Sequence, residues 1–301
     1  MKKVIFPTFN RVHEARQKLL LDELYKNFKV CITIYSKKDM SMSEVAVDIA
    51  GKFQLALDSE KPDLALIRGD RYEMLIPAML CAYNKIPIIH IEGFDLSGVI
   101  DNKVRYAISY LSDYHFVTNE DSYNRAKSMG FENVWNFGSL DVEYARSVTR
   151  HNAPESTKPY ILVLYHPVPG EDEFELFQAL ESFKDYQIKG IKSNRDYGKQ
   201  TYTEEYGPEE FIKLLRGTSC LVGNSSCGIK EAPALGISVV NVGERQANRL
   251  RPESVKDCKC EKKEIENMIE YQLKHKYEHS DLYFKPETSK RITEAITSLV
   301  I

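Results

Sequence analysis

The stretch Leu221-Val-Gly-Asn-Ser-Ser-Cys-Gly-Ile-Lys-Glu-Ala-Pro233 joins an apolar strand to a helical pattern. Cys220 to Val222 is a short apolar run, Gly223 to Ser226 is a loop of small and hydroxyl residues, and the helical pattern starts at Cys227. Such a loop and helix N-terminus aim backbone N–H groups and the positive end of the helix dipole at one place. The hydroxyls of Ser225 and Ser226 add donors, so the stretch favours phosphate binding.

The stretch does not match the two most familiar phosphate-binding loops. It lacks the Gly-Lys-Ser/Thr ending of a P-loop and is not a G-x-G-x-x-G sequence. From these residues alone, an ordinary N-cap and turn of an α/β protein is an equally good interpretation.

The alternation of short apolar strands and helix-period segments extends outward from this stretch in both directions. Ser41-Met-Ser-Glu44 predicts a capping box at the start of one helix. The expected strands of the N-terminal half are Val4–Phe6, Val30–Tyr35, Leu64–Ile67, Ile86–Ile91, His115–Val117 and Val134–Phe137. Those of the other half are Tyr160–Tyr165, Gln187–Ile191, Cys220–Val222 and Ile237–Val242. This order predicts an α/β fold with doubly wound parallel sheets.

The segment Asn152 to Lys158 has neither the helix nor the strand period and contains Pro154. We place a domain boundary there, which gives a Rossmann-like N-terminal domain over residues 1–151 and a Rossmann-like C-terminal domain over 152–285. Two such sheets side by side are expected to direct the carboxyl ends of their strands at a common cleft.

Composition excludes several classes of protein. The 301 residues are 43% hydrophobic with a formal net charge of −3, which gives no basic surface for nucleic acid. The six cysteines form no Cys-x-x-Cys pair, which fits reduced thiols in a cytoplasmic protein. The N-terminal apolar run is too short for a signal peptide, and no run of about 18 apolar residues predicts a membrane span. No metal constellation is visible, and no cofactor is expected.

Polar residues follow five of the expected strands, where open α/β sheets bind their ligands. The five clusters are Arg68-Gly-Asp-Arg71, His90-Ile-Glu92, His166, Asn224 with the two serines, and Gly243-Glu-Arg245. Each has an ordinary alternative: an N-cap for Asp70, an arginine pair for Glu92 and a structural role for His90. Carboxylates beside phosphate-type donors suit proton transfer on a phosphorylated substrate. The carboxylates are Asp70, Glu92 and Asp101; the donors are Arg11, His166, Ser225, Ser226, Arg245 and Arg249.

These motifs resemble the UDP-N-acetylglucosamine 2-epimerases. The resemblance runs in order from about Asp63 to Val255 and is carried by Gly69-Asp-Arg71, His90-Ile-Glu-Gly93, Ser97-Gly-x-Ile-Asp101 with Arg105, His166-Pro, Gly223-Asn-Ser-Ser-x-Gly-Ile-x-Glu-Ala-Pro233 and Val240-Asn-x-Gly-x-Arg-Gln246. It is closest to the hydrolysing branch, which makes N-acetylmannosamine for sialic-acid-type sugars. It implies the GT-B fold, with a cleft between the two Rossmann-like domains and a C-terminal helix, residues 286–301, packed back on the first.

The chemistry implied by the resemblance is proton removal at carbon 2 while UDP leaves carbon 1, followed by addition of water to the 2-acetamidoglucal. Matching the motifs makes Asp70, Glu92 and Asp101 the acid and base groups. His166, Ser225 and Ser226 would stabilise the departing diphosphate. Asn224, Arg11, Arg245 and Arg249 would bind substrate, and Glu231 the ribose hydroxyls. We also expect a homo-oligomer, a dimer or a tetramer.

The sequence departs from the family pattern at several positions. Of the usual N-terminal Gly-Thr-Arg-Ala-Asp/Glu loop only Arg11 matches, the usual Gly-Gly-Glu is Gly93-Phe-Asp95, and the usual histidine after Arg105 is Tyr106. The first domain is also shorter than the family's, mainly between Tyr35 and Pro62. Three alternatives therefore stay open: a non-hydrolysing UDP-sugar 2-epimerase, a GT-B glycosyltransferase, and a nucleotide-sugar-binding protein without chemistry.

Overall fold

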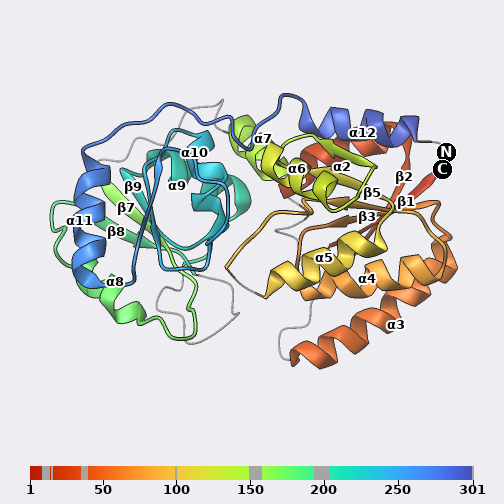
Figure 1. Ribbon diagram of the computed structural model, residues 1–301, viewed down its shortest axis with the longest axis horizontal. Helices are drawn as coiled ribbons and strands as arrows, with labels where there is room; N and C mark the ends of the chain where they lie inside the picture. The colour runs from red at the N-terminus through yellow and green to blue at the C-terminus, as the bar shows by residue number, and fades with distance from the viewer. Residues whose placement is uncertain are drawn as a thin grey trace. The chain divides into compact units, whose positions relative to one another are not determined.

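A computed structural model describes residues 1–8, 14, 16–34, 40–98, 100–148, 158–192 and 204–299. The chain forms two compact units (Figure 1). The first comprises Met1–Asp95, Ile100–Glu143 and Lys285–Ile301, and the second comprises Leu96–Val99 and Tyr144–Phe284.

The first unit is built on a six-stranded sheet of order β2-β1-β3-β4-β5-β6, in which every pair of neighbours is parallel. Its strands are β1 (Lys3–Thr8), β2 (Lys29–Ile34), β3 (Leu64–Arg68), β4 (Ile88–Ile91), β5 (Tyr114–Val117) and β6 (Val134–Asn136). Its helices are α2 (Lys18–Asn27), α3 (Met42–Glu60), α4 (Tyr72–Tyr83), α5 (Asp101–Leu111), α6 (Glu120–Ser128), α7 (Leu140–Val148, whose later residues belong to the second unit) and α12 (Thr288–Ser298).

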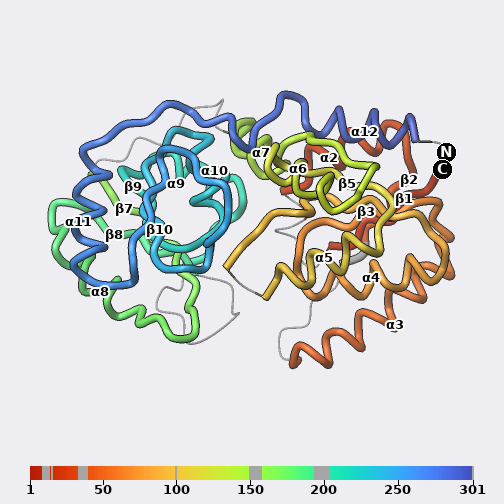
Figure 2. Tube along the Cα trace, viewed as in Figure 1, coloured from red at the N-terminus to blue at the C-terminus, as the bar shows by residue number. Residues whose placement is uncertain are grey.

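Apolar side chains cover both faces of this sheet. On one face, Ile49 and Phe53 of α3 and Met74 of α4 pack in one cluster with Ile5 and other strand residues. On the opposite face α12 lies along α2, as the blue and red helices in Figures 1 and 2 show. Burial on both faces explains why these strands are continuous apolar runs rather than alternating ones.

The second unit has a five-stranded parallel sheet of order β11-β10-β9-β7-β8. Its strands are β7 (Tyr160–Leu164), β8 (Gln187–Gly190), β9 (Cys220–Gly223), β10 (Val239–Val242) and β11 (Val255–Cys258). Its helical segments are α8 (Glu173–Leu180), α9 (Pro208–Gly217), the 3₁₀ turn η1 (Ser226–Gly228), α10 (Glu231–Ala234) and α11 (Lys262–Leu273). Helices α8 and α11 pack together over one face.

The predicted α/β class with parallel doubly wound sheets is confirmed. The capping box is also confirmed, because Ser41 Oγ accepts from the Glu44 N–H while Glu44 accepts from the Ser41 N–H. One expectation is wrong in extent: the helix from Cys227 is only a 3₁₀ turn followed by the four-residue α10. Pro233 lacks an N–H, which limits regular helix at this point.

Candidate active site

Asp70 follows β3 and is ion-paired with Arg105 of α5. The Arg105 side chain is only 1% exposed and also donates to the carbonyl oxygen of Asp95 and, at 2.7 Å, to Asn102 Oδ1. A buried guanidinium needs a countercharge, and Asp70 supplies it. The Asp70 side chain is nevertheless 27% exposed, which leaves part of the carboxylate open to a substrate. Asp70 is not the N-cap of α4, whose cap position is Arg71.

His90 is a structural histidine that supports the Asp70 turn. Its ring is fully buried, with Nε2 2.9 Å from the Gly69 carbonyl oxygen and Nδ1 2.9 Å from Ser109 Oγ. Because a carbonyl only accepts, Nε2 carries the proton, and Nδ1 accepts from the Ser109 hydroxyl. Burial lowers the pKa of His90 to about 4, so the ring is neutral near pH 7. The ordinary alternative proposed for this residue is therefore confirmed.

Glu92 stands directly after β4 in a left-handed conformation with φ of 66°. Its Oε1 accepts from Arg68 at 3.1 Å and from Ser139 at 3.2 Å, and Arg68 also pairs with Asp141 at 2.8 Å. Burial opposes the charge of Arg68, but Asp141 and Glu92 outweigh it and raise the arginine pKa. Glu92 is therefore paired with an arginine, as its structural alternative predicted. The same contacts hold its carboxylate in a fixed position.

Asp101 is the first residue of α5, and Ile100 occupies the N-cap position. Asp101 therefore does not cap α5. Its position in the first turn is one where the helix dipole favours negative charge. Asp101 is partly exposed and four residues before the buried Arg105 that holds Asp70. Helix α5 therefore carries Asp101 itself and also, through Arg105, holds Asp70.

The turn that departs from the family pattern is part of the core of the first unit. Phe94 is fully buried with φ of 62°, and its ring meets the edges of Tyr106 at 6.2 Å and Phe131 at 4.8 Å between centroids. Phe94 and Tyr106, two of the unusual residues, are therefore in contact. They fill one apolar cluster, so these two departures are a coupled change of packing.

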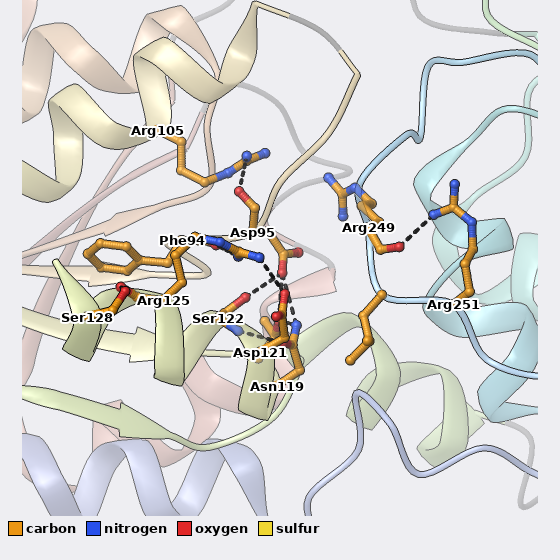
Figure 3. Close-up of polar contacts among 12 residues, drawn as sticks. Phe94, Asp95, Arg105, Asn119, Asp121, Ser122, Arg125, Ser128, Arg249 and Arg251 are labelled. Carbon is orange, nitrogen blue, oxygen red and sulfur yellow. Dashed lines mark hydrogen bonds and ion pairs between the residues drawn. The ribbon is translucent and has the colours of Figure 1, made fainter.

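Asp95, the third unusual residue, is buried in a hydrogen-bonded pocket shown in Figure 3. Its Oδ1 accepts from Asn119 Nδ2 at 3.0 Å and Ser122 Oγ at 2.8 Å. Arg125 donates to the Phe94 carbonyl at 2.5 Å from the neighbouring helix α6. These bonds fix the turn between Glu92 and Asp101 at several points.

The loop after β9 is closely fitted to the end of β7. A Cβ on Gly223, whose φ is 146°, would stand 2.1 Å from the Leu164 carbonyl oxygen, so only glycine fits. Asn224 is fully buried; its Oδ1 accepts from the His166 N–H at 2.7 Å, and its Nδ2 donates to the His166 carbonyl at 2.8 Å. The predicted substrate ligand Asn224 thus uses its side chain to join the two strand ends.

Ser225 and Ser226 present the donors that a phosphate needs. Ser225 Oγ accepts from Cys227 N at 3.4 Å, and the carbonyls of both serines accept from the following turn. Within the described residues the two serine N–H groups and the Ser226 hydroxyl make no hydrogen bond, and both residues are partly exposed. Because the following helix is short, these local donors rather than a long helix dipole carry any anion binding here.

The turn after β10 braces the same loop. Arg245 Nη1 and Gln246 Nε2 both donate to the Asn224 carbonyl oxygen, at 3.1 and 2.9 Å. Across the described chain, buried polar atoms without a partner include Gln246 Oε1 and His166 Nδ1. Burial, followed by the nearby charge of Arg245, lowers the pKa of His166 to about 3. His166 is therefore neutral near pH 7 and can offer a ligand a hydrogen bond rather than a charge.

The remaining predicted ligands lie in different surroundings. Glu231 is 3% exposed at the first position of α10, and Arg249 is partly buried. Arg11 lies outside the described residues. No group of three His, Cys, Asp or Glu residues in the described ranges could hold a metal ion. Within the same ranges, no helix is long and apolar enough to cross a membrane.

One known protein family matches most of the chain in sequence. The sequence model of the UDP-N-acetylglucosamine 2-epimerase family matches residues 12–297. The chain belongs to the UDP-N-acetylglucosamine 2-epimerase family.

Two bacterial members of this family are similar to the chain over most of their length. A protein of Neisseria meningitidis named UDP-N-acetylglucosamine 2-epimerase is 32% identical over 273 residues, covering 80% of this chain and 72% of the relative. A Legionella pneumophila protein named UDP-N,N'-diacetylbacillosamine 2-epimerase (hydrolyzing) is 32% identical over 324 residues, covering 93% and 86%.

Solved structures of the epimerase family share the fold. The Methanocaldococcus jannaschii UDP-GlcNAc 2-epimerase, solved in complex with UDP-GlcNAc and UDP, matches with a TM-score of 0.82 at 16% identity, covering 99% of each chain. At this identity the likeness shows the fold, and it confirms the predicted GT-B type of two Rossmann-like parallel-sheet units.

Several residues that hold the candidate site residues in place were not among the predicted ligands. Arg68 holds Glu92, Arg105 holds Asp70, and Gln246 braces Asn224. All three lie in or beside the motifs quoted from the sequence, which is the signal that could have identified them. A buried charged or amide side chain needs a hydrogen-bonding partner, so such a residue beside a predicted ligand is a candidate to hold that ligand in place.

Proposed function

We propose that the protein is a hydrolysing UDP-N-acetylglucosamine 2-epimerase. In this proposal the loop around Ser225 and Ser226 in the second unit binds the UDP diphosphate. The carboxylates Asp70, Glu92 and Asp101 of the first unit carry the proton transfers. The observation that carries the proposal is the pairing of Asp70 with the buried Arg105, because a substrate-accessible carboxylate held by a buried cation has the rigidity that acid–base catalysis needs.

In the proposed first step, Asp101 takes the proton from carbon 2 while the bond between carbon 1 and the UDP oxygen breaks. The electron pair of the carbon–hydrogen bond forms the double bond of 2-acetamidoglucal, and UDP leaves with the pair of the broken bond. Donors at Ser225, Ser226 and His166 stabilise the charge that develops on the departing diphosphate. Water then adds at carbon 1, and a proton returns to the opposite face of carbon 2, giving N-acetylmannosamine.

The hydrolysing subtype is supported by the Ser97-Gly-x-Ile-Asp101 motif and by the Legionella relative, whose name includes hydrolysis. That relative is named for UDP-N,N'-diacetylbacillosamine, whereas the Neisseria relative is named for UDP-N-acetylglucosamine. The acetamido group at carbon 2 and the UDP group at carbon 1 are common to both substrates. We therefore propose UDP-N-acetylglucosamine as the substrate. UDP-N,N'-diacetylbacillosamine is tested beside it in the same experiment.

The test is incubation of the protein with each sugar nucleotide in deuterated water, followed by proton and phosphorus NMR. Free UDP and free N-acetylmannosamine, deuterated at carbon 2, are expected in equal amounts. A stable mixture of UDP-N-acetylglucosamine and UDP-N-acetylmannosamine without free sugar would instead show a non-hydrolysing epimerase. Turnover of only the diacetylbacillosamine nucleotide would move the substrate assignment to that sugar.

Binding measurements address the proposed nucleotide loop separately. Replacing Ser225 and Ser226 together by alanine is expected to weaken UDP binding by about 1–3 kcal/mol, as for lost hydrogen bonds to a charged group. The matched control is the exposed pair Ser43 and Ser128 replaced by alanine, which should leave UDP affinity unchanged. If calorimetry gives the same UDP affinity for wild type, for the Ser225 and Ser226 variant and for the control, this loop is not the diphosphate site. UDP binding without carbon-2 exchange or sugar transfer would identify a binding protein.

A further inference from the structure

The four-residue segment Leu96–Val99, after β4, belongs with a different unit from its neighbours in sequence. Asp95 and Ile100 belong to the first unit, whereas Leu96, Ser97 and Gly98 belong to the second. We call Leu96–Gly98 the strap. The strap lies in the sequence between Glu92 and Asp101, two of the proposed acid–base residues.

Gly98 attaches the strap to the turn after β10. Its N–H donates to the Arg245 carbonyl oxygen at 3.1 Å. A Cβ on Gly98 would stand 2.0 Å from the Glu244 carbonyl oxygen and 3.3 Å from Ala247 Cβ. Gly98 does not have a left-handed φ, so glycine is needed here for the close approach of two backbones rather than for its conformation.

The turn that receives Gly98 is the one that braces the diphosphate loop. Arg245 and Gln246 donate to the Asn224 carbonyl oxygen, directly before the two serines. On its other side, the Glu244 N–H donates to Glu171 Oε1 at 3.0 Å. A displacement of the serine loop therefore reaches Gly98 through two side-chain hydrogen bonds and one backbone hydrogen bond.

The strap is short enough to limit where Asp101 can stand. Asp101 is three positions after Gly98, with two residues between them. Their Cα atoms are therefore at most roughly 10–11 Å apart, as the reach of an extended chain requires. At the other end, the Asp95 carboxylate is bonded to Asn119 and Ser122. With one end fixed and little slack at the other, the attachment of Gly98 restricts the start of α5.

We infer that Gly98 is a positioning residue that couples the diphosphate loop to Asp101. The inference rests on the proposed function and deepens it: filling of the loop by a nucleoside diphosphate sets the position of Asp101 through the turn after β10 and the strap. Gly98 itself touches neither the reacting carbon nor the proton. It acts on turnover through the placement of the base.

The test compares three proteins: wild type, Gly98→Ala and the control Gly51→Ala. Gly51, on α3, has no heavy atom within 4 Å of the Cβ it would gain, so its substitution adds the same methyl group without a clash. We expect Gly98→Ala to lower kcat for UDP release and for carbon-2 exchange by at least about tenfold, the scale of a misplaced catalytic group. KM and the Kd for UDP should stay within about threefold, and Gly51→Ala should match wild type. Unchanged kcat in Gly98→Ala would overturn the inference.

A second readout does not depend on turnover. Hydrogen–deuterium exchange is followed at the amides of residues 102–105, at the start of α5, with and without UDP. UDP should slow this exchange in wild type and in Gly51→Ala, and the slowing should be lost in Gly98→Ala although UDP is bound. Equal slowing in all three proteins would also overturn the coupling. If wild type binds UDP and shows the slowing but has no turnover, the proposed reaction fails while the coupling stands; if wild type does not bind UDP, both fail.

Discussion

The side-chain amide of Asn224 forms a reciprocal pair of hydrogen bonds with the backbone of His166. Asn224 follows β9 and His166 follows β7, and the two strands are neighbours in the parallel sheet. The amide therefore continues the pairing of the strands after both have ended. As a result, the two loops that carry the proposed diphosphate donors are bound to each other as one structure.

Asn224→Asp should be strongly destabilising. The substitution replaces the N–H donor to the His166 carbonyl by an oxygen and introduces a charge where the side chain is fully buried. We expect a loss of about 3 kcal/mol or more in the free energy of unfolding, together with weaker UDP binding. Urea denaturation measures this. Asn133→Asp is the control, because the exposed Asn133 also donates to a backbone carbonyl but remains solvated; similar losses in both variants would contradict the prediction.

Asp70→Asn should reduce stability as well as activity. It leaves the guanidinium of Arg105, 1% exposed, without its charged partner, and removal of one member of a buried pair costs about 3–5 kcal/mol. Because Asp70 is partly exposed, the lower end of that range is expected. Asp121→Asn removes the partner of the more exposed Arg125 and should cost less than about 1 kcal/mol. Thermal and urea unfolding compare the two, and equal effects would argue against the role of Asp70 as the countercharge.

Asp101→Asn should separate chemistry from folding. Asp101 begins α5 without capping it, and asparagine keeps its size. We expect the fold and UDP affinity to be retained while turnover falls by about 10² or more, the usual contribution of a positioned acid–base group. Deuterium exchange at carbon 2 should fall in parallel. Exchange at the wild-type rate would place the base elsewhere, with Asp70 and Glu92 as the remaining candidates.

Phe94→Ala should show that the unusual turn is a packing change. Phe94 is fully buried against Tyr106 and Phe131, so its truncation should cost about 3–5 kcal/mol. The control is Phe174→Ala, in which an exposed phenylalanine is removed and the cost should be well under that range. In a double-mutant cycle with Tyr106→Ala, the two losses should differ from additivity by about 0.5–1.5 kcal/mol. Strict additivity would show that the two rings are not coupled.

Buried histidines should make the protein sensitive to mild acid. The pKa values of His90, His115 and His166 are about 4, 3 and 3, against an ordinary value of 6.5, and burial is the main cause in each. The unfolded chain therefore takes up protons first as pH falls. This contribution to stability is complete above pH 6.5 and is lost as pH falls, down to about pH 4 for His90 and about pH 3 for His115 and His166. At pH 5 the loss is about 2 kcal/mol per histidine.

His115→Phe tests this pH dependence. Among the described residues His115 Nδ1 has no hydrogen-bond partner, and the ring packs edge-on against Phe94 and Phe131. Phenylalanine therefore keeps the aromatic contacts and removes the titration. The difference in unfolding free energy between pH 8 and pH 5 should shrink by about 2 kcal/mol. His279→Gln, an exposed site, should leave that difference unchanged. An unaltered pH dependence in His115→Phe would show that the ring titrates normally in the folded state.

The strands were predictable because burial on both faces makes each of them a visible apolar run. Two elements were not predicted from the sequence. Helix α7 follows β6 after only a short link. Strand β11 (Val255–Cys258) lies at the edge of its sheet and has half-exposed polar residues. At the site, the strand-end positions of Asp70 and Glu92 followed from the alternation of elements. Their arginine partners did not, since Arg105 is 35 residues from Asp70 and their contact depends on tertiary structure.

The short helix after Ser226 shows a different limit. Its residues have a helical pattern, but the 3₁₀ turn and Pro233 restrict the regular helix to four residues. The roles of Glu231, Arg245 and Arg249 toward a nucleotide stay predictions, and the residue-level assignments of the diphosphate loop rest on the binding experiments above.

Helix α12 has a consequence for how the protein is made. Ile292 and Ile296 complete the apolar cluster that contains Leu20 and Leu24 of α2, near the other end of the chain. During translation, every residue of the second unit emerges from the ribosome before α12 does. That face of α2 therefore stays uncovered until α12 has been synthesised. The half of the protein that is translated first is thus the last to complete its core, and a fragment ending near residue 148 would have the same uncovered surface.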